Sequence, residues 1–294
     1  MDLFPDGHHV WLSSSGRGGK YLHADDDGVG VRVSSKRASL LSAWKVHHAV
    51  SPGGQTYVLL CGAGYGRYLT VSRDPAPHGH KGRLVVQGSY DENNFNWVAW
   101  RPERVGAAGD GANEVILRHY SGYVLRANGK FLIWNRGVSA DVNDRTTPMS
   151  HWLVRAIPLR AIPPQLPPVM DPYHGWFSKM NIESVVPGVP GRIIRFVRAA
   201  DDGTLPPNAA WNEFRFDGRS VFELRAAVAR ALGEANALGI KLCARAGTFA
   251  LQTPLTMDLP RRSLPRYEKN MDIVVIADGS PGAAALEYPD VDAQ

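Results

Sequence analysis

The chain has little of what marks secreted or membrane proteins. Only two of its 294 residues are cysteine, which is too few for a disulfide framework and favours a reducing compartment. It contains no run of about 18 apolar residues, so we expect no membrane span. The first residues lack the basic and apolar stretches of a secretory signal, and no Asn-x-Ser/Thr acceptor occurs. These absences predict a soluble protein of the cytoplasm.

Charge of both signs is sparse as well, and it is unevenly placed. Charged residues make up 21% of the chain and hydrophobic residues 44%, values that suit a folded core. Residues 1–157 hold 18 Lys and Arg against 13 Asp and Glu, a net charge of +5, whereas residues 158–294 hold 15 of each. No stripe of clustered Lys and Arg accompanies this excess, so we expect no nucleic-acid partner.

The part before residue 158 repeats one order of four short strands three times. Each strand is rich in Val, Leu, Tyr and Trp and is bounded by Gly, Asn, Asp or Ser, which is typical of hairpins. Three blades would not close a propeller, whereas three repeats of four strands suit a β-trefoil. We therefore predict a trefoil over residues 5–157. Its expected strands are 9–12, 20–24, 31–33 and 43–46; 57–60, 67–71, 83–86 and 96–99; and 114–117, 123–127, 130–133 and 151–154.

Two sets of equivalent residues are expected to build the trefoil core. One is a pair in the second strand of each repeat, and the other is a tryptophan near the end of each repeat. The pairs are Tyr21-Leu22, Tyr68-Leu69 and Val124-Leu125, and the tryptophans are Trp44, Trp97 and Trp152.

The sequence changes character after residue 157. Eight prolines between residues 158 and 190 predict a semi-extended linker, with a helical turn or two around residues 176–181. Strands are then expected at 191–198, 211–216, 240–244, 255–259 and 272–276. A helix opens at Ser220, with Glu223 completing a capping box, and Gly239 is expected to end it. This order predicts an α+β β-grasp, or ubiquitin-like, domain over residues 191–278. The Pro/Gly/Ala-rich and then acidic residues 279–294 are expected to form a disordered tail.

No motif in the chain predicts catalysis. The glycine-rich segments 16–20 and 62–66 lack the Lys-Ser/Thr pair or the helix that a phosphate site needs, so we interpret both as hairpin turns. The closest histidine pairs, at 47–48 and 78–80, lack the further ligands that zinc requires. Neither Cys61 nor Cys243 has a recognisable base nearby. We expect no enzyme activity, no cofactor and no metal.

Three segments resemble the plant "domain of unknown function 569" family: residues 1–4, the run Leu125-Arg126-Ala127-Asn128-Gly129, and residues 211–218. The resemblance covers nearly the whole chain. It implies a fascin-like, actin-crosslinking-type β-trefoil followed by a ubiquitin-like domain. By analogy with fascin, it also implies a non-catalytic protein that binds actin filaments, although a fold does not by itself imply a function. The contacts expected are basic residues in equivalent loops of the first two repeats, Lys36 and Arg37 in one and Lys81 and Arg83 in the other.

Two alternative functions remain open. The first is a carbohydrate-binding, lectin-like trefoil, although the Gln-x-Trp of ricin-type repeats is replaced here by Ala43-Trp44, Asn96-Trp97 and His151-Trp152. The second is a protein-interaction adaptor that acts through the ubiquitin-like domain. The face of its first strand that carries Arg192, Ile194 or Phe196, and Arg198 is then expected to bind an acidic partner. The chain does not end in Gly-Gly, so this domain is not interpreted as a conjugated modifier.

Nine of the ten histidines lie before residue 158. An ordinary imidazole titrates near a pKa of about 6.5. We therefore expect positive charge on the trefoil to rise as the pH falls from about 7.5 to 6, and binding to an acidic partner to strengthen.

Overall fold

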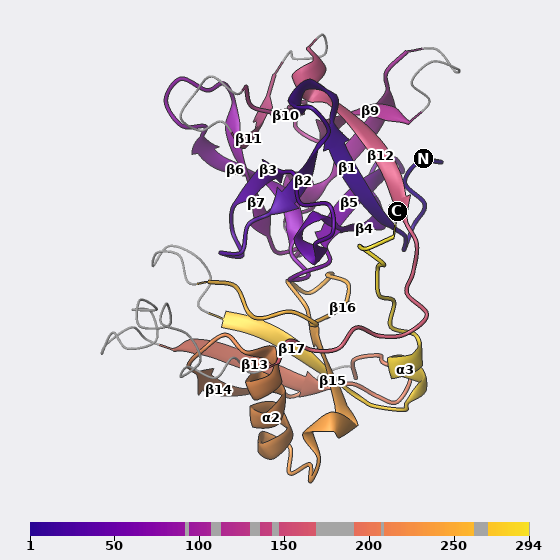
Figure 1. Ribbon diagram of the computed structural model, residues 1–294, viewed down its shortest axis with the longest axis vertical. Helices are drawn as coiled ribbons and strands as arrows, with labels where there is room; N and C mark the ends of the chain where they lie inside the picture. The colour runs from indigo at the N-terminus through magenta and orange to yellow at the C-terminus, as the bar shows by residue number, and fades with distance from the viewer. Residues whose placement is uncertain are drawn as a thin grey trace. The chain divides into compact units, whose positions relative to one another are not determined.

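The computed structural model describes residues 1–91, 94–106, 113–129, 136–142, 147–168, 191–206, 209–261 and 270–293. The chain divides into two compact units, coloured along the sequence in Figure 1. The first unit consists of Met1–Ala161, Ala246–Leu251 and Tyr288–Gln294, and the second of Ile162–Arg245 and Gln252–Glu287. Two segments late in the sequence therefore belong to the first unit.

The first unit is a β-trefoil, as predicted. Its strands are β1 (His9–Ser14), β2 (Lys20–Ala24), β3 (Val31–Ser34) and β4 (Trp44–Val50); β5 (Thr56–Gly62), β6 (Tyr68–Pro75), β7 (Arg83–Gly88) and β8 (Trp100–Arg104); and β9 (Glu114–His119), β10 (Val124–Ala127), β11 (Val138–Asp141) and β12 (His151–Ile157). The predicted strand at 130–133 and the helical turn at 176–181 fall outside the described residues. Short helices precede the last strand of each repeat, at Leu40–Ser42, Phe95–Val98 (α1) and Pro148–Ser150, and another lies at Ser15–Arg17.

Six of these strands close into a barrel. The first and fourth strands of the repeats pair in the cyclic order β1, β4, β5, β8, β9, β12 and back to β1, which leaves no free edge. The remaining hairpins, β2–β3, β6–β7 and β10–β11, meet through their second strands. Bridges join Gly30 to Val86, Arg32 to Gly137 and Leu84 to Ser139.

One hydrogen bond recurs in every repeat of the trefoil. A fully buried tryptophan at the start of the last strand donates its indole N–H to the carbonyl of the fully buried leucine in the second strand. The pairs are Trp44 with Leu22 at 3.1 Å, Trp100 with Leu69 at 2.9 Å and Trp152 with Leu125 at 3.1 Å. The prediction of Trp97 for the second repeat is wrong, because Trp97 lies in α1 and Trp100 occupies the core position.

The second unit is a β-grasp, also as predicted. Its strands are β13 (Arg192–Arg198), β14 (Asn212–Phe216), β15 (Ile240–Ala244), β16 (Thr253–Pro254) and β17 (Asn270–Ala277), in the sheet order β14-β13-β17-β15-β16. The β13–β17 pair is parallel. Helix α2 (Val221–Ala231) buries Val221, Leu224 and Val228 against the sheet. The strand predicted at 255–259 is not formed, although Leu255 and Leu259 are buried in the same core.

The end of α2 differs from the prediction. Ser220 caps the helix by accepting the N–H of Glu223 at 3.2 Å, as expected. The left-handed residue that ends it is Gly233, with φ of 73°, rather than Gly239. The N–H groups of Gly233 and Glu234 bond back to the carbonyls of Arg230 and Ala229, the pattern of a Schellman motif. Gly239 instead ends a short helix at Ala237–Gly239.

The prediction of a disordered tail at 279–294 is wrong for its described residues. Helix α3 (Pro281–Ala284) and Leu286 pack against the sheet face opposite α2, where Cys243 and Val274 are buried. Val291, which belongs to the first unit, packs with Trp11. These side chains bury apolar surface, so the described part of the segment is folded although its Pro/Gly/Ala-rich and acidic composition predicts disorder.

Candidate functional site

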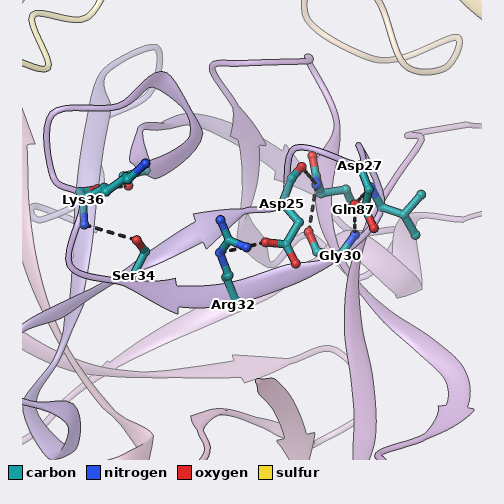
Figure 2. Close-up of polar contacts among 9 residues, drawn as sticks. Asp25, Asp27, Gly30, Arg32, Ser34, Lys36 and Gln87 are labelled. Atoms are coloured by element: carbon teal, nitrogen blue, oxygen red, sulfur yellow. Dashed lines mark hydrogen bonds and ion pairs between the residues drawn. The ribbon is translucent and has the colours of Figure 1, made fainter. Parts of the chain in front are cut away.

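The first pair of predicted contact residues lies between β3 and β4. Lys36 is exposed, and its backbone is fixed by two bonds: its N–H donates to Ser34 Oγ at 3.2 Å, and its carbonyl accepts from Ser42 Oγ at 2.5 Å. Figure 2 shows Lys36 beyond the end of β3. The guanidinium of Arg37 stacks over the Trp11 ring at 4.8 Å. Lys36 is therefore available to a partner, whereas Arg37 is partly committed to the fold.

The β2–β3 hairpin beside this pair carries three consecutive acidic residues. Asp27 Oδ1 accepts the N–H groups of Val29 and Gly30, both at 2.8 Å, and so shapes the turn. Arg32 Nε lies 2.9 Å from Asp25 Oδ1 (Figure 2). Burial raises the pKa of Asp25 to about 6, and the charge of Arg32 opposes that shift.

Gln87 of β7 fixes this hairpin from the next repeat. Its side-chain amide donates to the carbonyls of Asp25 at 3.1 Å and Gly30 at 2.8 Å, and its own N–H donates to the carbonyl of Val29 at 2.7 Å (Figure 2). The side chain is 4% exposed. The acidic hairpin is thus a structural junction between two repeats.

The second pair lies in a different kind of loop. Lys81 is exposed in the β6–β7 hairpin, whose counterpart in the first repeat is β2–β3, and not the β3–β4 connection that holds Lys36. The prediction that the two loops are equivalent is therefore wrong. Arg83 donates through Nε to Tyr123 Oη at 3.0 Å and through Nη1 to the carbonyl of Arg73 at 2.6 Å. Its guanidinium is engaged within the trefoil.

The predicted binding face of the ubiquitin-like domain is a core face. Ile194 and Phe196 are 0% and 3% exposed in the cluster under α2. Arg192 donates to the carbonyl of Pro260 at 2.7 Å, and Arg198 pairs with Glu234. The expectation that Ile194 or Phe196 is presented to a partner is wrong, because the strand period of two places these apolar residues inward. Binding of an acidic partner by Arg192 and Arg198 stays a prediction.

Burial also limits what the titratable groups can do. Neither Cys61 nor Cys243 forms a disulfide, and both are buried. Burial raises the pKa of Cys243 to about 12. Burial lowers the pKa of His9 to about 3 and the pKa values of His23 and His119 to about 4. These three imidazoles do not gain charge between pH 7.5 and 6, which corrects the expectation for them.

Within the described ranges, no group of three or more His, Cys, Asp or Glu is placed to hold a metal ion. No helix in the same ranges is long and apolar enough to cross a bilayer.

Family comparison agrees with this architecture. Residues 1–155 match the family model described as "Beta-trefoil domain of unknown function (DUF569)". The chain belongs to the DUF569 family. Residues 190–276 match the DUF569 associated ubiquitin-like domain. The expected family, with a β-trefoil followed by a ubiquitin-like domain, is therefore confirmed.

Solved structures similar to this DUF569 protein cover about half of it. The designed 3-fold symmetric protein ThreeFoil is 21% identical with a TM-score of 0.39, covering 50% of this chain and 96% of its own. The SDF2-like protein from Arabidopsis thaliana is 16% identical with a TM-score of 0.40, covering 51% and 93%. A Macrolepiota procera ricin B-like lectin, in complex with lactose, is 14% identical with a TM-score of 0.39, covering 51% and 96%. No curated protein matches the sequence.

Proposed function

We propose that this DUF569 protein is a non-catalytic, cytoplasmic binding protein whose trefoil contacts the acidic surface of actin filaments. The observation that carries the proposal is the exposure of Lys36 and Lys81 on a part of the chain with a net charge of +5. Long-range attraction of this kind favours an acidic partner. The resemblance to fascin-like trefoils supplies the filament as that partner.

The titratable groups support a non-catalytic role. A nucleophilic cysteine needs a lowered pKa and access to substrate, whereas burial raises the pKa of Cys243 and Cys61 is fully buried. Neither thiol forms a disulfide, which supports the reducing cytoplasm as the compartment.

Co-sedimentation of the full chain with filamentous actin tests the proposal. We expect pelleting at about 50 mM salt and a several-fold weaker signal at about 300 mM, because salt screens exposed charges. The variant Lys36→Ala/Lys81→Ala should bind several-fold more weakly than Arg155→Ala/Arg230→Ala, a control that removes two other exposed cations. Absence of pelleting at low salt, or equal losses in the two variants, would contradict the proposal.

A second candidate, carbohydrate binding, is favoured by one exposed aromatic ring. Tyr120 is 43% exposed and is supported from below by Tyr57 and Phe95, with ring centroids 5.5 and 5.9 Å away. A rigid aromatic face of this kind suits the apolar face of a sugar. A glycan array that gives a signal lost in Tyr120→Ala would support this function; an array without signal would exclude the glycans it displays.

A further inference from the structure

The segment Ala246–Leu251, which belongs to the first unit, is held there through its backbone. The N–H of Tyr90 donates to the carbonyl of Ala246 at 2.7 Å, and the N–H of Phe249 donates to the carbonyl of Tyr90 at 3.0 Å. The N–H of Leu251 donates to Tyr68 Oη at 3.0 Å. Proteins that recognise short peptides use main-chain bonds of this kind for affinity and side-chain contacts for specificity.

The carboxylate of Asp91, which is held in place by its own turn, binds the threonine of the segment. Asp91 Oδ1 accepts both the N–H of Thr248, at 2.9 Å, and its hydroxyl, at 3.2 Å. Asp91 itself is held by neighbours in its own turn, since Ser89 Oγ donates to its Oδ2 at 2.7 Å and its N–H donates to Asn94 Oδ1 at 2.7 Å. The carboxylate therefore needs little reorganisation to accept a threonine, and bonds to a charged acceptor are the stronger ones.

The position before the threonine accepts only glycine. Gly247 has φ of +107°, and a Cβ added there would lie 2.4 Å from the carbonyl oxygen of Tyr90. Both the backbone conformation and the space exclude a side chain.

The two positions after the threonine, Phe249 and Ala250, differ in how far the surrounding residues restrict the side chain. Ala250 is 7% exposed and packs in the cluster that contains Tyr57 and Tyr68, so a larger side chain has no room. The Phe249 ring lies tilted against the Tyr90 ring, with 5.6 Å between the ring centroids, but Phe249 stays 50% exposed. The segment is thus recognised through four consecutive residues: glycine, threonine, an aromatic residue and alanine.

We propose that the surface formed by Tyr68, Tyr90 and Asp91, the Tyr90–Asp91 site, is a peptide-recognition site with Ala246–Leu251 as its resident ligand. The ligand class is a short segment of the order Gly-Thr-aromatic-Ala that forms a turn, in which the N–H of Ala250 donates to the carbonyl of Gly247 at 3.2 Å. This peptide-recognition site does not depend on Lys36, Lys81 or the proposed actin binding. A tethered segment acts at an effective concentration of about millimolar, so an external peptide of this class binds well only when the resident segment is displaced.

The test uses the full chain and a labelled peptide of residues 244–252, followed by fluorescence anisotropy. In the variant Gly247→Val the resident segment cannot occupy the site, and we expect it to bind the peptide at least about tenfold more tightly than the unmodified chain does. A peptide with valine in place of its glycine should not bind. Adding Asp91→Ala to the Gly247→Val variant should weaken binding at least about tenfold, because it removes the charged acceptor of two hydrogen bonds.

A milder variant guards against misfolding. Thr248→Val keeps the shape of the side chain but removes the hydroxyl that Asp91 accepts, and it should also bind the peptide more tightly than the unmodified chain. Circular dichroism checks that each variant is folded. If neither folded variant binds the peptide, or if the Asp91→Ala change leaves binding unaltered, the proposal is overturned.

Discussion

At the scale of single residues, the threefold repeat is clearest in three tryptophans that occupy equivalent positions. Each donates to the carbonyl of a leucine in its own repeat. The positions between leucine and tryptophan differ, however: 22 from Leu22 to Trp44, but 31 from Leu69 to Trp100. Most of the additional residues lie in the β6–β7 hairpin, which is longer than β2–β3. The sequence pattern does not fix the length of this hairpin, so spacing alone does not identify the tryptophan that the barrel buries.

Replacing each of the two neighbouring tryptophans should distinguish their roles. Trp100→Phe removes a buried hydrogen bond, leaves the carbonyl of Leu69 without its donor and opens a cavity, so we expect a loss of about 2–4 kcal/mol in the free energy of unfolding. Trp97→Phe removes an indole that stacks on Arg73 at 5.1 Å and should cost less than about 1 kcal/mol. Urea unfolding of both variants measures the difference, and similar losses would contradict the assignment.

Individual cations show the limit of sequence reasoning about the candidate site. The exposure of Lys36 and Lys81 was predictable, because long charged side chains are rarely buried. The engagement of Arg83 by Tyr123 and of Arg192 by Pro260 was not, since these partners lie 40 and 68 positions away. Only the folded chain shows which cations are already committed to it.

At the scale of elements, local signals were reliable where both partners of an interaction are close in sequence. The cap of α2 by Ser220 is such a case, and the strand order of the β-grasp followed from the same kind of pattern. The end of α2 was misplaced because two glycines follow it, Gly233 and Gly239. Which of them adopts the left-handed conformation depends on the route of the chain from α2 to β15. This route cannot be predicted from the composition.

Alanine at each of these glycines tests the assigned end of the helix. Gly233→Ala places a side chain at φ of 73° and should cost about 1 kcal/mol in the free energy of unfolding. Gly239→Ala meets no atom within 4 Å and no left-handed backbone, so it should change stability by less than about 0.5 kcal/mol. Thermal unfolding compares the two, and a larger loss for Gly239→Ala would favour the helix end predicted from the sequence.

At the scale of the whole chain, segments late in the sequence pack into folded units although their composition predicts no folded structure. Asp290 and Asp292 pair with Arg160, about 130 positions earlier, and Val291 packs with Trp11. Acidic residues beside Pro and Gly are typical of disorder, so the sequence alone favoured a disordered tail. The Tyr90–Asp91 site was missed because Asp91 and Thr248 lie 157 positions apart, although the Ser89-Tyr90-Asp91 and Gly247-Thr248 runs are both typical of turns that present backbone groups.

The buried titratable groups of the trefoil set how the stability of the whole molecule depends on pH. Three imidazoles have folded-state pKa values of about 3 to 4, chiefly because of burial, with Lys45 and Arg32 adding to the shifts of His9 and His23. The unfolded chain therefore binds more protons than the folded chain below pH about 6.5. The raised pKa of Asp25, about 6, acts in the opposite direction, since the folded chain takes up that proton first.

We therefore expect the free energy of unfolding to be highest above pH about 6.5 and to fall as the pH is lowered through 6 and 5. Three imidazoles against one carboxyl leave a net difference of about two protons, which corresponds to a slope of roughly 2–3 kcal/mol per pH unit near pH 5. Burial also lowers the pKa of His47, which adds to the slope in the same direction. Urea unfolding at pH 7, 6 and 5 measures it. His119→Asn should make the slope shallower and Asp25→Asn should make it steeper, because each removes one of the opposing groups. Stability that rises on acidification, or a slope that neither variant changes, would show that the buried histidines do not set the acid sensitivity of the fold.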